Sequence, residues 1–182
     1  MTGVAALPDR YLCVCADDFG ISEGVNSAVL ALSERRSISA TGCMVERPAW
    51  RLGALGLRTL RPGHLEVGLH LDLTRVPEAA FSEASLASLV LRSHLGLLRP
   101  ARIRDQIRNQ LSRFEDDLGR RPCFIDAHRH VHQLPMVRDV LVEELASRYQ
   151  APLPWVRSPA ASRRGAAGDT TTAEVSFALG GA

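Results

Sequence analysis

The sequence centres on CFIDAHRHVH (residues 123–132), in which a short apolar run is followed by an aspartate and three histidines at every second position. Side chains two residues apart point to the same side of an extended chain. If the backbone stays extended, four side chains face one cavity: Asp126, His128, His130 and His132. Neutral imidazole is the commonest protein ligand for a divalent metal, and a nearby carboxylate fixes its tautomer. The stretch therefore favours a metal or catalytic site over the alternative, a solvated histidine-rich loop.

Composition places the chain among soluble globular proteins. Its 182 residues are one domain's worth, with 46% hydrophobic and 23% charged residues and a net charge of +2. The arginines are scattered among acids, so we expect no nucleic-acid partner. No apolar stretch approaches the roughly 20 residues of a membrane span, and residues 1–10 lack the pattern of a secretory signal. The four cysteines have no zinc-finger spacing. These features predict a cytoplasmic protein.

A second polar cluster follows the first apolar run, residues 11–16 (YLCVCA), which has the pattern of a buried strand. Asp17 and Asp18 come next, and two carboxylates at the end of a buried strand are costly unless they are paired or bound to a metal. Adjacent strand residues point to opposite sides, so the two need not share one role unless the chain turns, which Gly20 permits. The alternative is that one aspartate caps the next helix, although Ser22 is the better cap candidate.

His70 lies inside a third apolar run, residues 66–73 (EVGLHLDL), in phase with Gly68 and Asp72. A histidine on the polar face of a buried strand is often a core residue with a hydrogen-bond partner. His70 becomes a site candidate because polar side chains also end the first strand and the strand at residue 123.

The order of apolar runs and amphipathic stretches predicts the fold. We expect strands at residues 11–16, 38–45, 66–73, from 123, and 153–156. We expect helices at residues 23–36, 49–60, 85–92, 101–118 and 135–149. Such alternation indicates an α/β fold with a parallel sheet, and α/β enzymes collect their chemistry at the carboxyl ends of the strands. Residues 1–158 form the predicted domain, and residues 159–182 a weakly structured tail.

Three motifs carry a resemblance to a known family. ADDFGIS (residues 16–22) with Gly24-Val25-Asn26, GLHL (residues 68–71) and DAHRHVH (residues 126–132) resemble the three signatures of the YdjC-like carbohydrate deacetylases. That family includes the chitooligosaccharide and hopanoid-associated deacetylases. The resemblance runs in order from about residue 11 to residue 159.

The resemblance implies a distorted, incomplete, parallel-stranded (β/α) barrel-like fold and removal of an acetyl group from an N-acetylated sugar. It implies that a divalent metal is held by Asp18, His70 and His128, with Asp17 as the general base. Asp126 would orient a ligand histidine or line the site, and two further histidines would contact substrate or transfer protons: His130 and His132. The ligand types suit zinc, whereas the family more often has magnesium.

The sequence departs from the family in one respect. Members of the family continue into a later Cys-His-Pro-type motif, whose histidine serves as general acid, whereas no histidine follows His132 here. A metal- or sugar-binding remnant without turnover is therefore one alternative. A metal-dependent phosphoesterase is another, but it would favour a glycine-rich loop or an arginine cluster, and Arg129 points away from the histidine face of an extended strand.

The strand count also predicts self-association. Five expected strands fall short of the roughly eight in a closed parallel barrel, which leaves apolar surface to be covered. Residues 11–16 and one stripe of the helix at 101–118 need such cover. The stripe consists of Ile103, Ile107, Leu111, Phe114 and Leu118. We expect a homodimer.

Overall fold

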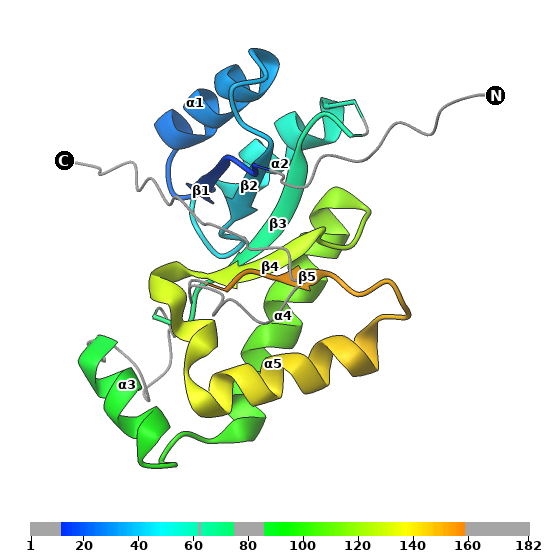
Figure 1. Ribbon diagram of the computed structural model, residues 1–182. Coiled ribbons are helices and arrows are strands. Elements are labelled where there is room, and N and C mark those ends of the chain that lie inside the picture. Colours follow the sequence, from blue (N-terminus) through cyan, green and yellow to red (C-terminus); the bar gives the residue numbers. More distant parts are fainter. Residues whose placement is uncertain (1–11, 62, 75–85, 159–182) are drawn as a thin grey trace, which may run out of the picture.

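The computed structural model describes residues 12–61, 63–74 and 86–158. Its centre is a single sheet of parallel strands, in which each strand pairs with the next along the chain (Figure 1). The strands are β1 (Cys15–Phe19), β2 (Ala40–Cys43), β3 (Glu66–Leu71), β4 (Phe124–Ala127) and β5 (Trp155–Val156). The predicted α/β, parallel-stranded class is therefore confirmed, and the sequential strand order is the one that a (β/α) barrel also has.

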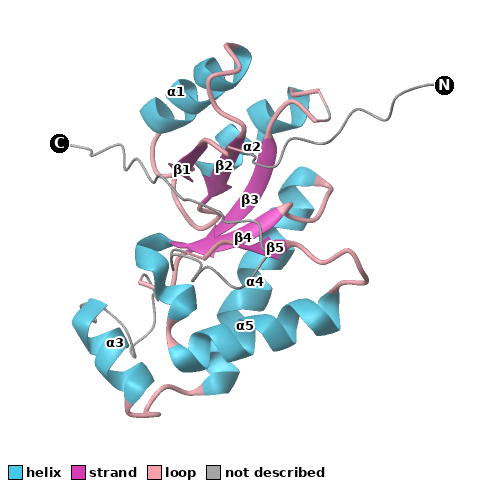
Figure 2. Cartoon of the chain, in the orientation of Figure 1, coloured by secondary structure: helices cyan, strands magenta, loops and turns pink. Residues whose placement is uncertain are grey.

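Helices connect the strands and cover the sheet (Figure 2). They are α1 (Glu23–Glu34), α2 (Trp50–Thr59), α3 (Leu86–His94), α4 (Pro100–Leu118), the 3₁₀ segment η1 (His128–Gln133) and α5 (Pro135–Arg148). All five predicted α-helices are present, with ends shifted by one or two residues. Among the described residues, no helix is long and apolar enough to cross a membrane.

Capping residues fix where the helices begin and end. The Ser22 hydroxyl accepts a hydrogen bond from the Val25 amide at 3.3 Å, as expected for the N-cap of α1. Proline occupies the first turn of both α4 and α5, where its missing N–H costs nothing. Gly119 ends α4 with φ 68°, a left-handed conformation that suits glycine.

The predicted apolar stripe of α4 is buried within the chain. Ile103, Ile107, Leu111 and Phe114 are at most 1% exposed. The helix packs against β3, α2 and α5 of the same chain. The stripe therefore needs no second copy to cover it, and this part of the argument for a dimer is wrong.

The first strand lies later in the chain than its apolar run predicts. β1 begins at Cys15 and includes both aspartates, whereas Leu12 is 74% exposed and Val14 36% exposed. Residue 11 lies outside the described residues, as does the predicted tail, 159–182. The prediction of a strand at 11–16 is wrong because hydropathy counts ionised aspartates as solvent-exposed. In the folded chain, however, they are held by partners from other strands.

Candidate metal centre

A bulge in β1 turns two adjacent aspartates toward the same site. The pairing of β1 with β2 shifts register between Ala16 and Phe19, and Asp18 takes φ 64°. Aspartate is among the few residues that tolerate this left-handed region. Asp17 and Asp18 consequently both point at side chains from β3 or from the segments that follow β4 and β5, which a regular strand would not allow.

The turn after Asp18 is clamped by a buried asparagine. The Gly20 amide donates to Asn26 Oδ1 at 2.6 Å, and Asn26 Nδ2 donates to the Ala49 carbonyl at 2.9 Å. Gly20 has φ 101°, and a Cβ there would lie 2.8 Å from the Met44 carbonyl oxygen. Asn26 thus ties the end of β1 to the start of α2 and fixes the backbone that carries the aspartates.

His70 connects the two carboxylates on either side of it. β3 and β4 pair with His70 opposite Asp126, and His70 Nδ1 lies 2.7 Å from Asp126 Oδ1. Its other nitrogen, Nε2, lies 3.4 Å from Asp18 Oδ1. Room for the ring comes from Gly42 on β2, where a Cβ would lie 3.2 Å from His70 Cβ. Because Nδ1–H donates to Asp126, Nε2 is the nitrogen presented to the site.

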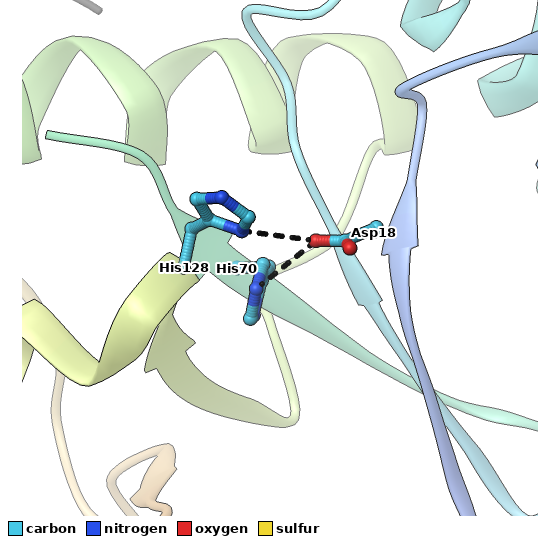
Figure 3. A group of neighbouring side chains, drawn as sticks. All are labelled: Asp18, His70 and His128. Atoms are coloured by element: carbon cyan, nitrogen blue, oxygen red, sulfur yellow. Dashed lines mark hydrogen bonds and ion pairs between the residues drawn. The ribbon is translucent and has the colours of Figure 1, made fainter. Parts of the chain in front are cut away.

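His128 completes the group. It follows β4 directly, and its Nδ1 lies 3.2 Å from Asp18 Oδ1 (Figure 3). One donor atom from each of Asp18, His70 and His128 lies within 4.8 Å of the others. The side chains of Asp18 and His128 are 27% and 23% exposed, so the group is open to solvent on one side.

The electrostatics of the group favour a cation. Hydrogen bonds from His128 and His70 hold the pKa of Asp18 well below its usual range. Burial acts to lower the pKa of His70, but hydrogen bonds to Asp126 and Asp18 raise it to about 10. A proton on His70 thus binds tightly between two carboxylates, at a position that a divalent cation can also occupy.

Arg157 is a site residue that the sequence reasoning missed. Its Nη1 donates to Asp17 Oδ1 at 2.8 Å and to Asp126 Oδ2 at 2.8 Å. The arginine directly follows β5. It is therefore a polar residue at the carboxyl end of a strand, the position by which the aspartates and histidines were chosen as site candidates. Applying that rule to the last predicted strand would have found it.

The backbone does not stay extended through residues 123–132, so the condition under which four side chains would face one cavity is not met. β4 ends at Ala127, and η1 begins at His128. Within η1, Arg129 and His130 take φ 56° and 57°, in the left-handed region. The alternation of side chains therefore breaks after His128, and the later histidines reach different surroundings.

Those histidines separate into one exposed and one buried residue. His130 is exposed, whereas His132 is 1% exposed and its Nε2 donates to the Arg157 carbonyl at 2.8 Å. Burial lowers the pKa of His132, which favours the neutral ring. Of the two histidines expected at the surface, His94 is exposed, but His64 is half-buried with Nε2 2.9 Å from the Ser33 carbonyl.

Fold and site together define an α/β protein with a candidate centre for one divalent metal at the carboxyl ends of its strands. A model of the family described as YdjC-like protein matches residues 11–179. The chain therefore belongs to the YdjC-like family.

Curated relatives share about a third of their residues with this chain. A chitooligosaccharide deacetylase from Serratia marcescens is 33% identical over 162 residues, which cover 85% of this chain and 63% of the relative. A carbohydrate deacetylase from Geobacillus stearothermophilus is 35% identical over 159 residues, covering 82% of this chain and 61% of the relative. The chain thus spans little more than three fifths of the length of these relatives.

A solved structure shares the fold. A provisionally assigned cellobiose-phosphate cleavage protein from Enterococcus faecalis V583 matches with a TM-score of 0.61 at 20% identity. The match covers 76% of this chain and 56% of that chain. At this identity, the likeness supports the architecture alone.

Proposed function

We propose that Asp18, His70 and His128 hold one divalent metal ion. One carboxylate and two imidazoles are ligands for such an ion, and they leave positions for water and substrate. Charge supports the same reading. The site has three carboxylates and one guanidinium, and a single divalent cation balances the remaining charge. Nitrogen ligands favour zinc, and the family resemblance favours magnesium.

We further propose that the chain carries the metal-dependent part of a carbohydrate deacetylase, which hydrolyses the acetamide of an N-acetylated sugar. The observation that carries this proposal is Asp17, a carboxylate next to the donor group but outside it, with a side chain 19% exposed. The names of the curated relatives point to the same chemistry.

The side chains divide the work of hydrolysis. A bound metal would polarise the acetamide carbonyl and stabilise negative charge that develops on its oxygen. Asp17 takes the proton from the attacking water, which needs a carboxylate that is ionised and reachable. Asp126 holds the His70 ring by its Nδ1–H, at 2.7 Å. His132 supports the backbone at Arg157, and the exposed His130 is the histidine of the pair that can contact substrate.

The contacts of Arg157 make a phosphoesterase a less favoured function than a deacetylase. Phosphoryl transfer needs cationic donors that are free to bind phosphate oxygens. The Arg157 guanidinium already donates to Asp17 and Asp126, and Arg129 is exposed on η1. Neither arginine supplies a preformed phosphate clamp at the donor group.

One assay separates deacetylase, phosphoesterase and binding remnant. The purified chain is incubated with an N-acetylated chitooligosaccharide and, separately, with an aryl phosphate, each with added Zn²⁺, with added Mg²⁺ or with chelator. We expect metal-dependent release of acetate and no release of phosphate. Phosphate release would favour the phosphoesterase. Metal binding without release of either product would favour the remnant.

We also retain the proposal of a homodimer, now on the exposed apolar residues of the outer strands. Leu12 and Val14 lie beside β1, while Trp155 and Val156 form β5 and are 46% and 39% exposed. Light scattering over a range of dilutions tests this, because a stable monomer at low micromolar concentration would show that these residues need no partner.

A further inference from the structure

The described residues contain two overlapping groups of potential metal ligands. The first is Asp18, His70 and His128, the proposed metal centre. The second is Asp17, His70 and Asp126, whose donor atoms also lie within 4.8 Å of one another. His70 belongs to both, with Nε2 facing Asp18 in the first group and Nδ1–H donating to Asp126 in the second. While that hydrogen bond is kept, the ring can bind an ion only in the first group, and an ion in the second group would be held by the two carboxylates. The number of ions that the chain binds therefore depends on whether one group or both groups can hold a divalent cation.

The second group already contains a cation. Arg157 Nη1 lies 2.8 Å from Asp17 Oδ1, 3.1 Å from Asp17 Oδ2 and 2.8 Å from Asp126 Oδ2. One nitrogen therefore meets three carboxylate oxygens, as a small metal ion would. The residue is only 7% exposed, so its charge is not screened by water as a surface pair would be.

The position of Arg157 is built into the fold. Its backbone follows β5, whose Trp155 and Val156 pair with β4. Its carbonyl accepts from His132 Nε2 at 2.8 Å and from Gln133 Nε2 at 3.2 Å. The 3₁₀ segment that begins at His128 thus holds the arginine in place. The buried His132 contributes to this by its hydrogen bond to the Arg157 carbonyl. A guanidinium keeps its charge at every physiological pH, so it cannot leave the site by losing a proton.

We propose that Arg157 acts as a fixed cation that fills the Asp17–Asp126 group, so that the chain binds one divalent ion, at Asp18, His70 and His128, and not two. This rests on the proposed metal centre. Without the arginine, Asp17 would lose its cationic partner and Asp126 would keep, among the described residues, only the hydrogen bond from His70, a deficit of positive charge that a second divalent ion relieves. Arg157 is then a positioning residue, which keeps Asp17 available as a base by preventing it from becoming a metal ligand.

The test counts Mn²⁺ ions per chain, by elemental analysis after equilibrium dialysis and by electron paramagnetic resonance. We expect one ion per unmodified chain, with the spectrum of isolated Mn²⁺. Arg157→Met should bind two, with a spectrum broadened by coupling between neighbouring ions. Arg157→Lys restores a cation and should return the count to one. Arg104→Met is the matched control, since it removes an arginine from a partly exposed pair with Glu143 and should leave the count at one.

Several results would overturn the proposal. A folded Arg157→Met protein that still binds one ion at saturation would show that the carboxylates form no second site. A second ion between Asp17 and Asp126 in crystals of the unmodified chain soaked in Mn²⁺ would also overturn the proposal, because Arg157 would then not exclude it. This outcome does not depend on whether any variant folds. The proposed metal centre fails separately, if the unmodified chain binds no ion. An Arg157→Met chain that then gains one would still support the role of the arginine.

Discussion

Two polar clusters of this chain differ in how their charges are balanced. Between α4 and α5, the Glu115 carboxylate accepts from Arg148 Nε at 3.2 Å and from the Tyr149 hydroxyl, so it is fully paired within the chain. At the carboxyl ends of the strands, the three carboxylates of Asp17, Asp18 and Asp126 have a single guanidinium among them in the described part of the chain, and the ring of His70 lies between Asp18 and Asp126. The paired cluster joins two helices and needs nothing further. The unbalanced cluster keeps an excess of negative charge, which under our proposal a divalent cation balances.

The largest expected effect comes from removing a metal ligand. His128→Ala should weaken metal binding by more than about 100-fold, because even loss of an outer hydrogen bond to a ligand can cost 10–100-fold. Saturating metal stabilises a folded chain by about 2.7 kcal/mol at a hundred times Kd, so it should raise the Tm of the parent by about 5–10 °C and leave this variant unchanged. His94→Ala is the control, and equal metal content in the two variants would contradict the ligand assignment.

The next effect separates base from ligand within the unbalanced cluster. Asp17→Asn keeps the size of the side chain but removes the proton acceptor, so deacetylation should fall by about 10²–10⁴-fold while metal stays bound. Asp18→Asn should instead lose metal. Acetate release and metal content are measured on the same samples. Loss of metal in Asp17→Asn together with retention in Asp18→Asn would show that the two roles are reversed.

Much of the fold follows from the sequence because periodicity and caps are local signals. Ser22, Gly119 and the prolines at the starts of α4 and α5 each set a boundary through a contact within a few residues. Alternating strands and helices likewise predict a parallel sheet. Their order within the sheet does not follow from the alternation, and only the family resemblance, which implies a barrel-like fold, points to it. β1 was misplaced because the partners that make its aspartates compatible with a strand come from other strands.

The site was predictable only in part. Asp18, His70 and His128 were assigned by family resemblance, and the structure brings their donor atoms together. The left-handed backbone at Arg129 and His130 was not foreseeable from the alternating pattern, which is equally compatible with a strand. Arg157 lies 140 residues from Asp17 and 31 from Asp126, so no local pattern shows the ion pairs themselves. The one sequence signal for Arg157 is its position directly after the last predicted strand.

A smaller effect should follow from crowding the unbalanced cluster without removing any ligand. In Gly42→Ala the new methyl would lie 3.2 Å from His70 Cβ and 3.4 Å from Asp17 Oδ1, so the ring must shift. We expect metal affinity to fall by about 10-fold, the lower end of the effect of disturbing a ligand's surroundings. Gly24→Ala is the matched control, because its nearest neighbour is Ser22 Oγ at 4.0 Å and alanine favours α1. Calorimetric titration with Zn²⁺ measures both, and equal affinities would show that the ring tolerates the methyl.

The smallest effect concerns the paired cluster around Glu115 and should leave metal binding unchanged. Burial acts to raise the pKa of Glu115, but hydrogen bonds from Arg148 and Tyr149 lower it below its ordinary value of 4.5. A carboxylate with a lowered pKa in the folded state stabilises the protein above its ordinary pKa, and this contribution is lost as the pH falls through the lowered value. Glu115→Gln should cost about 1–2 kcal/mol of unfolding free energy at neutral pH, discounted for partial exposure. The difference from the parent should shrink as the pH falls below 4.5.

Denaturant melts across this range measure the difference. Glu143→Gln is the control, since that side chain is 66% exposed and its replacement should cost less than about 0.5 kcal/mol. A difference that stays constant with pH would mean that the ionised carboxylate contributes nothing beyond its shape.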